Sequence, residues 1–201
     1  MAYLILVRHG ESEWNAKGLW TGLTDIGLSQ KGKEEAKQAA QIIKDLPIDE
    51  MFTSKLCRAI DTGTIILDII GKAGIPIFYD KALNERDYGD FTGKNKWEIQ
   101  QKVGENKFLQ IRRSFDFQIP NGESLKQVYE RVIPYYKSSI LPKLKSGTNI
   151  LISAHGNSLR ALIKYLENIS DIDIPKLELP TGGIYVYQIG QNGEVANKQI
   201  R

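Results

Sequence analysis

Short apolar runs alternate along this chain with longer stretches in which apolar residues recur every three or four positions. A strand that is covered on both faces lacks the alternation of polar and apolar residues, so such a run predicts a buried strand. Four segments have this pattern: residues 3–7, 50–53, 149–153 and 184–189. We therefore expect these segments to form strands of a largely buried sheet.

The stretches between these runs predict helices, because their apolar residues return to one helical face every three or four positions. One such face includes positions 36, 39, 40 and 43, after a candidate N-cap at Ser29, and a second includes positions 128, 132, 136, 140 and 144. Residues 56–70 and 158–167 are two further candidates. Proline lacks an amide donor and clashes with the preceding turn, so Pro134 and Pro142 predict kinks or breaks in the second helix.

The alternation of strands and helices predicts the fold class. It is typical of an α/β fold, a three-layer αβα sandwich in which helices cover both faces of a mainly parallel central sheet. A chain of 201 residues is expected to form one domain, residues 1–201. In such folds the active site lies at the carboxyl ends of the strands. Residues 80–120, rich in Gly, Asn, Arg and Lys, are interpreted as loops that form the site.

Composition and charge narrow the classes of function. The chain is 41% hydrophobic and 25% charged, as globular domains are, and no stretch approaches the roughly 20 apolar residues of a membrane span. Cys57 is the only cysteine, which fits a reducing compartment, and we expect a cytoplasmic protein. The net charge is +3, but lysines and glutamates are interspersed, so a nucleic-acid partner is not expected. Functional positive charge should instead lie in a pocket.

Two histidines are the main candidates for chemistry. His9 and His155 are the only histidines of the chain, and each directly follows a predicted strand and precedes a glycine. Both would emerge at the same edge of the sheet. Glycine lets the backbone approach a ligand closely, and the free amides at the start of a following helix suit an oxyanion or a phosphate. The pattern favours a catalytic pair over two unrelated histidines at strand ends.

Longer motifs place these histidines in a family context. The segment LVRHGESEWN, residues 6–15, resembles the signature of the histidine phosphatase, or phosphoglycerate mutase, superfamily. Further segments resemble the cofactor-dependent mutases within it: LNER at 83–86, YG at 88–89, Gly93, NK at 95–96 and RR at 112–113. The resemblance continues through RVIPY at 131–135 and AHGNSLRAL at 154–162, so it covers most of the chain.

The resemblance implies a role for each motif residue. His9 is the nucleophile that becomes phosphorylated, and Glu85 is the general acid and base. Charge on the transferring phosphoryl group is neutralised by Arg8, Arg58 and His155, since the arginine fork matches phosphate oxygens. The substrate-binding residues that it implies are Arg8, Ser12, Asn15, Thr21, Gly22, Arg58, Glu85, Tyr88, Lys96, Arg112, Arg113, Gly156 and Asn157.

The implied activity is that of a 2,3-bisphosphoglycerate-dependent phosphoglycerate mutase, an isomerase of glycolysis and gluconeogenesis that interconverts 3-phosphoglycerate and 2-phosphoglycerate through phospho-His9. The implied cofactor is 2,3-bisphosphoglycerate, which primes His9, and no metal is expected because two histidines are too few for a metal cluster. The alternative is a broad-specificity histidine phosphatase that hydrolyses small phosphoesters. The expected partners are small phosphoglycerates and further copies of the chain in a dimer or tetramer, without nucleic acid or membrane.

The chain also departs from the longer mutases that it resembles. Few residues separate Arg113 from Pro120, where those relatives have an insertion, and the chain ends soon after its last predicted strand, without their tail. Asp87 replaces a histidine that is common in the family. Both missing segments help to close the site in the longer mutases, so we expect altered closure and an altered ratio of mutase to phosphatase activity.

Overall fold

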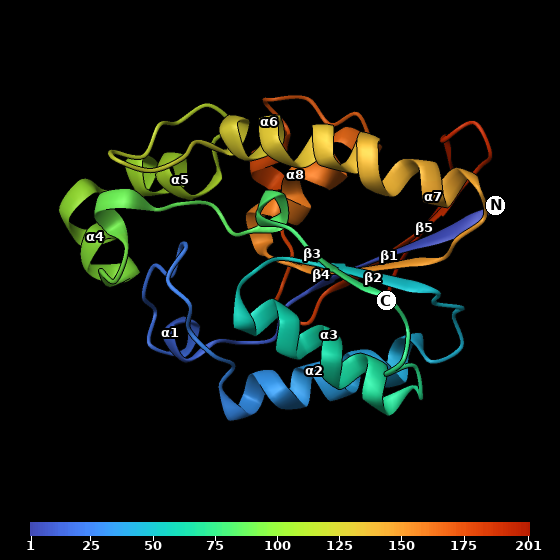
Figure 1. The fold of residues 1–201 in the computed structure, drawn as a ribbon. Helices are drawn as coiled ribbons and strands as arrows, with labels where there is room; N and C mark the ends of the chain where they lie inside the picture. The colour runs from blue at the N-terminus through green and yellow to red at the C-terminus, as the bar shows by residue number, and fades with distance from the viewer.

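A central sheet organises residues 1–201, all of which the computed structural model describes (Figure 1). Its six strands lie in the order β3-β2-β4-β1-β5-β6. Their bounds are β1 Ala2–Arg8, β2 Glu50–Thr53, β3 Ile77–Tyr79, β4 Ile150–Ala154, β5 Ile184–Ile189 and β6 Val195–Ile200. Strands β3, β2, β4 and β1 run parallel, β5 is antiparallel to β1, and β6 is antiparallel to β5. The sheet is mainly parallel, as predicted.

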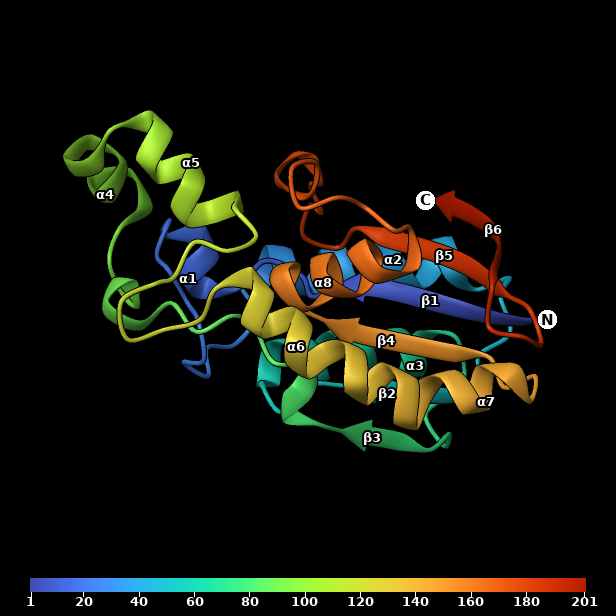
Figure 2. The same cartoon turned by 90° about the horizontal axis from the view of Figure 1, so that it is seen from above.

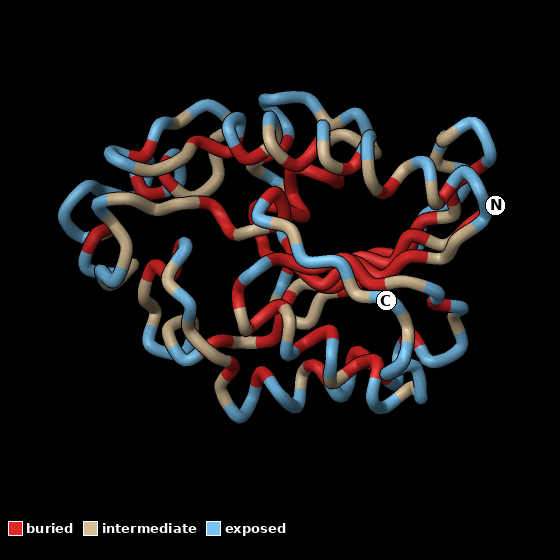
Figure 3. The backbone as a smooth tube through the Cα atoms, viewed as in Figure 1, coloured by how far each residue is buried: buried red, intermediate tan, exposed pale blue.

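Helices cover both faces of the sheet and complete the predicted sandwich (Figure 1). On one face lie α2 (Gln30–Ile43) and α3 (Cys57–Ile69), and on the other lie α6 (Leu125–Tyr135), α7 (Leu141–Lys145) and α8 (Gly156–Leu166). Alternate residues of β1 face the two layers, because Ile5 and Val7 pack with α2 and α3 whereas Leu4 and Leu6 pack with α6 to α8. Figure 3 shows the inner strands of the sheet as a buried layer, which explains their lack of polar alternation.

The helical path from α6 to α7 changes its hydrogen-bonding pattern between the two prolines. Pro134 lies inside α6, one residue before its end, and a π-helical turn, η3 (Tyr136–Ile140), connects α6 to α7. Pro142 lies in the first turn of α7, where a missing amide donor removes no intrahelical hydrogen bond. The chain stays helical from Leu125 to Lys145, so the structure has a π-helical distortion between the two prolines and no break.

Residues 80–120 are more regular than predicted, and their interpretation as loops was wrong. They include α4 (Lys96–Val103) and α5 (Glu105–Arg113), together with the 3-10 turns η1 (Lys81–Leu83) and η2 (Gly89–Phe91). Figure 2 shows α4 and α5 beyond the end of the sheet. They pack on a small separate cluster made of Trp20, Ile99, Phe108, Ile111 and Ile119. Each helix contributes only one or two residues to it, so no apolar periodicity marked either helix in the sequence.

Short and exposed elements also escaped the apolar pattern. Strands β3 and β6 form the two edges of the sheet and are largely exposed. Strand β3 has only three residues, and half of the β6 residues are polar, so neither stands out as a buried strand. The single-turn elements α1 (Glu13–Ala16) and η4 (Ile174–Lys176) are too short for periodicity. No helix has both the length and the apolar composition needed to cross a membrane.

Candidate active site

The two histidines lie side by side at the carboxyl ends of adjacent parallel strands. His9 follows β1 and His155 follows β4, and the strand register pairs Arg8 with Ala154 immediately before them. The backbone amide of His9 donates to the Ala154 carbonyl oxygen at 2.9 Å. The centroids of the two rings are 4.9 Å apart, with 62° between the ring planes. The fold therefore brings both imidazoles to one edge of the sheet.

The hydrogen bonding of His9 leaves one ring nitrogen free for attack. Its Nδ1 lies 2.6 Å from the carbonyl oxygen of Gly10. A carbonyl oxygen only accepts, so Nδ1 carries the hydrogen and Nε2 keeps its lone pair. Burial, reinforced by the charges of Arg58 and Arg8, lowers the pKa of His9 well below 6.5. His9 is therefore a neutral nucleophile at neutral pH.

Two guanidinium groups flank His9, one from the buried Arg58 and one from the half-buried Arg8. Arg58, in the first turn of α3, donates to the carbonyl oxygens of Thr24 at 2.9 Å and Gly22 at 2.8 Å. Arg8, at the end of β1, donates through Nη1 to the Leu179 carbonyl, and its buried Nε has no partner. Carbonyl partners orient these groups without neutralising them. The positive charge is therefore available for an anion placed against His9.

A carboxylate faces the same space from the segment after η1. Glu85 is 8% exposed, and its Oε1 accepts from the backbone amide of Arg86 at 2.8 Å and from the side-chain amide of Asn157 at 3.0 Å. Its Oε2 has no hydrogen-bond partner in the chain. The backbone at this point is held by Arg131, which donates to the carbonyl oxygens of Ala82, Asn84 and Glu85. One carboxylate oxygen is thus fixed and the other is free to exchange a proton.

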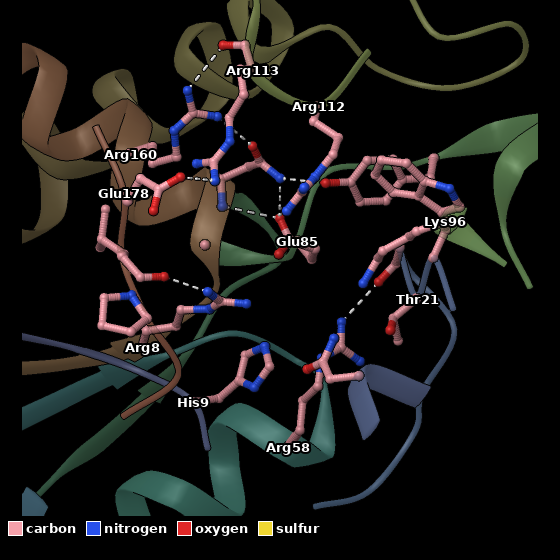
Figure 4. A pocket seen from close by; sticks show the side chains of 18 residues that line it. Arg8, His9, Thr21, Arg58, Glu85, Lys96, Arg112, Arg113, Arg160 and Glu178 are labelled. Atoms are coloured by element: carbon pink, nitrogen blue, oxygen red, sulfur yellow. Dashed lines mark hydrogen bonds and ion pairs between the residues drawn. The ribbon is translucent and has the colours of Figure 1, made fainter. Parts of the chain in front are cut away.

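These side chains surround a cavity of about 410 Å³ (Figure 4). Most of the residues proposed from the sequence line it, and they are Arg8, His9, Asn15, Thr21, Gly22, Arg58, Glu85, Tyr88, Lys96, Arg112, Arg113, Gly156 and Asn157. Ser12 does not, because its hydroxyl accepts from the Asn15 amide at 3.1 Å and caps α1. His155 is fully buried and lies against His9 rather than on the cavity wall.

A second group of cations lies across the cavity from His9. Lys96 begins α4, and Arg112 and Arg113 end α5. Burial, followed by the charges of Arg112 and Arg8, lowers the pKa of Lys96 to about 8. Arg113 forms a 2.5 Å ion pair with Glu178, a largely exposed carboxylate. Positive charge at both ends of one cavity suits a small molecule with two anionic groups.

The sequence did not single out every lining residue. Trp20, Arg160, Glu178, Leu179 and Pro180 also line the cavity. Arg160 is buried and donates to the Asn157 side-chain oxygen at 3.1 Å and to the Arg113 carbonyl at 3.0 Å. It lies one helical turn after Asn157 on α8, so its spacing from a residue already proposed could have revealed it.

Three residues of the site could also act as ligands of a metal ion. His9, Glu85 and His155 offer ligand atoms that lie within 4.8 Å of one another, and two imidazoles with one carboxylate are zinc ligands in some enzymes. Burial lowers the pKa of both histidines, however, and the charges of Arg58 and Arg8 lower it further. The same repulsion acts on a divalent cation, so the site suits an anion better.

Comparison with known proteins places this arrangement in a family. The histidine phosphatase superfamily (branch 1) matches residues 4–199. The chain belongs to this superfamily. Among solved structures, an alpha-ribazole phosphatase from Shigella flexneri is 26% identical, with a TM-score of 0.80 over 99% of this chain and 94% of that one. A mycobacterial glucosyl-3-phosphoglycerate phosphatase, at 21% identity, shares the fold with a TM-score of 0.83 over 100% and 98% of the two chains.

Relatives with higher identity carry a different name. The chain is 46% identical to a 2,3-bisphosphoglycerate-dependent phosphoglycerate mutase of Parvibaculum lavamentivorans, over 98% of this chain and 95% of that protein. It is 43% identical to phosphoglycerate mutase 1 of Saccharomyces cerevisiae, over 96% and 89% of the two chains. The first alignment runs over 199 positions and the second over 219. The yeast protein therefore carries internal residues that have no counterpart here.

Proposed function

We propose that this superfamily member is a 2,3-bisphosphoglycerate-dependent phosphoglycerate mutase that interconverts 3-phosphoglycerate and 2-phosphoglycerate. Relatives of that name match nearly the whole chain at 42–49% identity. The observation that carries the chemistry is the neutral His9 imidazole, with a free Nε2, beside two guanidinium groups whose hydrogen bonds go to backbone carbonyl oxygens and not to a carboxylate. The enzyme is thus an isomerase that works by phosphoryl transfer.

The geometry supports a two-step transfer. The Nε2 lone pair of His9 attacks phosphorus, the N–P bond forms, and the bond from phosphorus to the substrate oxygen breaks. The leaving oxygen takes a proton from Glu85, whose Oε2 is free, while Arg8 and Arg58 stabilise the charge on the phosphoryl oxygens. In the second step the phosphoryl group leaves His9. Glu85 accepts the proton of the other substrate hydroxyl as that oxygen attacks phosphorus and the N–P bond breaks.

The cofactor supplies the first phosphoryl group. In this proposal 2,3-bisphosphoglycerate transfers one phosphoryl group to His9 and leaves as a monophosphoglycerate. Its second phosphate and its carboxylate would lie toward Lys96, Arg112 and Arg113, on the opposite side of the cavity. Reorientation of the bisphosphorylated intermediate then exchanges the two phosphates between His9 and these cations.

The test of the nucleophile is a single substitution. His9→Ala should abolish mutase activity and remove the acid-labile label that radioactive 2,3-bisphosphoglycerate leaves on the wild-type protein. A coupled assay of 3-phosphoglycerate conversion, with and without added cofactor, measures the activity, and circular dichroism checks that the fold is kept. Label retained by the variant would assign the nucleophile to another residue.

The same assay separates the mutase from a phosphatase. The structural relatives named above are phosphatases, so hydrolysis of small phosphoesters through phospho-His9 is the second candidate. A mutase converts 3-phosphoglycerate without net release of phosphate and is accelerated by the cofactor. Phosphate release that matches or exceeds isomerisation would make the hydrolase the main activity.

We propose that the reaction needs no metal. EDTA should leave mutase activity unchanged within about twofold, since arginine and lysine side chains neutralise the phosphates in place of a cation. The control is EDTA that is saturated with Mg²⁺ before addition, which separates chelation from binding of the polyanion itself. Inhibition by EDTA alone that added metal ions reverse would show that the His9, Glu85 and His155 set is a metal centre.

We further propose that the enzyme is a cytoplasmic homo-oligomer, a dimer or a tetramer. Support for assembly comes from the edge strand β3, which leaves Phe78 37% and Tyr79 48% exposed. An unpaired edge with aromatic side chains is a surface that a second copy can extend or cover. Support for the compartment comes from the single cysteine, Cys57.

A further inference from the structure

Arg160 is a buried cation whose hydrogen bonds lead to Glu85 (Figure 4). It lies on α8, three residues after Asn157, and it is only 3% exposed. Its Nη1 donates to the Asn157 side-chain oxygen, Oδ1, at 3.1 Å. Its Nη2 donates to the carbonyl oxygens of Arg113 at 3.0 Å and Ile174 at 2.9 Å. All three partners are neutral oxygens, so Arg160 is not held in the protein by an ion pair.

The contact with Arg160 fixes the orientation of the Asn157 side-chain amide. The Nδ2 of this amide donates to Glu85 Oε1 at 3.0 Å and to the Tyr88 hydroxyl oxygen at 2.8 Å. A guanidinium group only donates, so only the amide oxygen can face it. Arg160 therefore excludes the flipped amide, in which Oδ1 would face the Glu85 carboxylate. The amide group that faces Glu85 is the donor.

All the donors that reach Glu85 converge on one of its two oxygens. Oε1 accepts from the backbone amides of Arg86 at 2.8 Å and Asn157 at 3.2 Å, as well as from Asn157 Nδ2. Such an oxygen is a poor site for a proton, so the proton of the acid form lies on Oε2. Oε2 has no partner in the chain and is open to the cavity. A Cβ on Gly156 would lie 3.8 Å from Oε2 and 3.5 Å from Arg8 Nε, so Oε2 lies on the side of the Arg8 guanidinium.

We propose that Arg160 is a positioning residue for the general acid: by fixing the Asn157 amide, it keeps the exchangeable proton of Glu85 on Oε2, where the leaving oxygen of the substrate takes it. This inference rests on the proposed function, because the proton belongs to the same transfer. Without the guanidinium, the amide can turn over. Its oxygen then offers the Glu85 proton an acceptor on the side away from the cavity, and protonation of the leaving oxygen slows.

Arg160 also fastens the end of α5, and the two roles have different kinetic signatures. The hydrogen bond to the Arg113 carbonyl supports the cations that face His9 across the cavity, so its loss weakens binding of the substrate and raises KM. The hydrogen bond to Asn157 acts on proton transfer, so its loss lowers kcat.

Three variants isolate the contact with Asn157. Arg160→Met removes every donor, whereas Arg160→Lys keeps a charged donor of about the same reach. Asn157→Asp leaves Arg160 its acceptor and removes the donor that faces Glu85, so it tests the same contact with the guanidinium in place.

Lys164 provides the matched control, because it is a second buried cation on the same face of α8. It is 9% exposed and donates to the Ile169 carbonyl oxygen at 2.5 Å. It makes no hydrogen bond to Asn157 or Glu85. Lys164→Met therefore removes a cation from the same helix without changing the path of the proton.

Single-turnover labelling of His9 by 2,3-bisphosphoglycerate measures the step that needs the proton. Arg160→Met and Asn157→Asp should slow the maximal rate about tenfold or more, with the half-saturating concentration nearly unchanged, since a hydrogen bond to a charged group biases an equilibrium by about this factor. Arg160→Lys should regain most of the loss, and Lys164→Met should stay within about twofold of the wild type. A change in the half-saturating concentration alone would leave only the fastening role and overturn the proposal.

A substrate with a better leaving group provides the second measurement. The p-nitrophenolate of p-nitrophenyl phosphate leaves without a proton, so its release in a single turnover should be nearly as fast in Arg160→Met as in the wild type. Equal slowing of Arg160→Met with p-nitrophenyl phosphate and with 2,3-bisphosphoglycerate would overturn the proton role.

A double-mutant cycle identifies the residue through which Arg160 acts. Glu85→Gln should slow labelling by 2,3-bisphosphoglycerate about 10²–10⁴-fold, the usual contribution of a general acid. In that background Arg160→Met should cause no further loss, because the proton that it positions is already absent. Losses that multiply would overturn the proposal. A wild-type protein that takes no label would overturn the proposed function instead.

Discussion

Lys96 differs from the other cations of the cavity because its charge is lost near physiological pH. Its ammonium group is mostly buried and lies 5.7 Å from the centroid of the Trp20 ring. Desolvation by burial is the largest cause of its lowered pKa, which is about 8 against an ordinary 10.5. The arginines of the same cavity keep their charge far above this pH. Binding of an anion should therefore depend on pH through Lys96.

We expect kcat/KM for 3-phosphoglycerate to fall above pH 8, toward about tenfold per pH unit, because the free enzyme then carries a neutral amine at position 96. The substrate phosphate, with a second pKa of about 6, has no titration there. Initial rates at low substrate concentration between pH 7 and pH 10 measure the profile.

Lys96→Arg is the control for this pH dependence. Arginine keeps a positive charge at the same position, so the decline near pH 8 should disappear even if the absolute rate is lower. An unchanged decline in Lys96→Arg would assign the titration to another group.

The loop that follows β1 depends on two glycines in contact. A Cβ on Gly32 would lie 2.0 Å from the Glu11 carbonyl oxygen, and a Cβ on Gly10 would lie 2.1 Å from the Gly32 carbonyl oxygen. Glu35 of α2 accepts from the Glu11 amide at 2.7 Å in the same contact. The start of α2 thus fixes Gly10, whose carbonyl in turn fixes the tautomer of His9.

Gly32→Ala should therefore destabilise the protein by about 1–3 kcal/mol or more, because backbone cannot yield as a flexible side chain can. It should also lower kcat, since displacement of Gly10 releases the His9 ring. Urea unfolding midpoints and the mutase assay measure the two effects. Gly74→Ala is the matched control: a Cβ there meets nothing within 4 Å, so its stability should change by less than about 0.5 kcal/mol. Equal behaviour of the two variants would disprove the contact.

The elements that the sequence predicted are those with many residues in the main core. The apolar runs marked β1, β2, β4 and β5, and the periodic faces marked α2, α3, α6 and α8, because each packs on the sheet. Helices α4 and α5 were missed because they pack on a cluster that tertiary contacts assemble from distant segments. Most cavity residues were found from motifs, whereas Glu178 lies in a segment without one and was missed. Ser12, proposed from its motif, proved to be a helix cap.

At the scale of the whole molecule, the cavity is walled by the sheet edge and by the unit that contains α4 and α5. Two buried arginines fasten that unit to the rest of the protein. Arg86 donates to the carbonyl oxygens of Ile111 at 3.0 Å and Phe117 at 3.0 Å, and Arg160 donates to that of Arg113. The segment between Arg113 and Pro120 is short, and these hydrogen bonds hold it near both ends. It offers little free chain for closing over a bound substrate.

A mutase has to keep water away from phospho-His9 while its bisphosphorylated intermediate reorients, and closing segments normally exclude that water. With the short 113–120 segment, we expect faster hydrolysis of 2,3-bisphosphoglycerate, relative to mutase turnover, than in a relative with additional internal residues such as the yeast protein. Greater loss of the phosphoryl group should also make activity depend more strongly on added cofactor.

The measurement is phosphate release and isomerisation in one preparation of each enzyme, at equal substrate and cofactor concentrations. Grafting the additional residues into the 113–120 segment should lower the ratio if they exclude water. A ratio equal to or below that of the yeast enzyme would show instead that α4, α5 and the neighbouring subunits seal this site without an insertion.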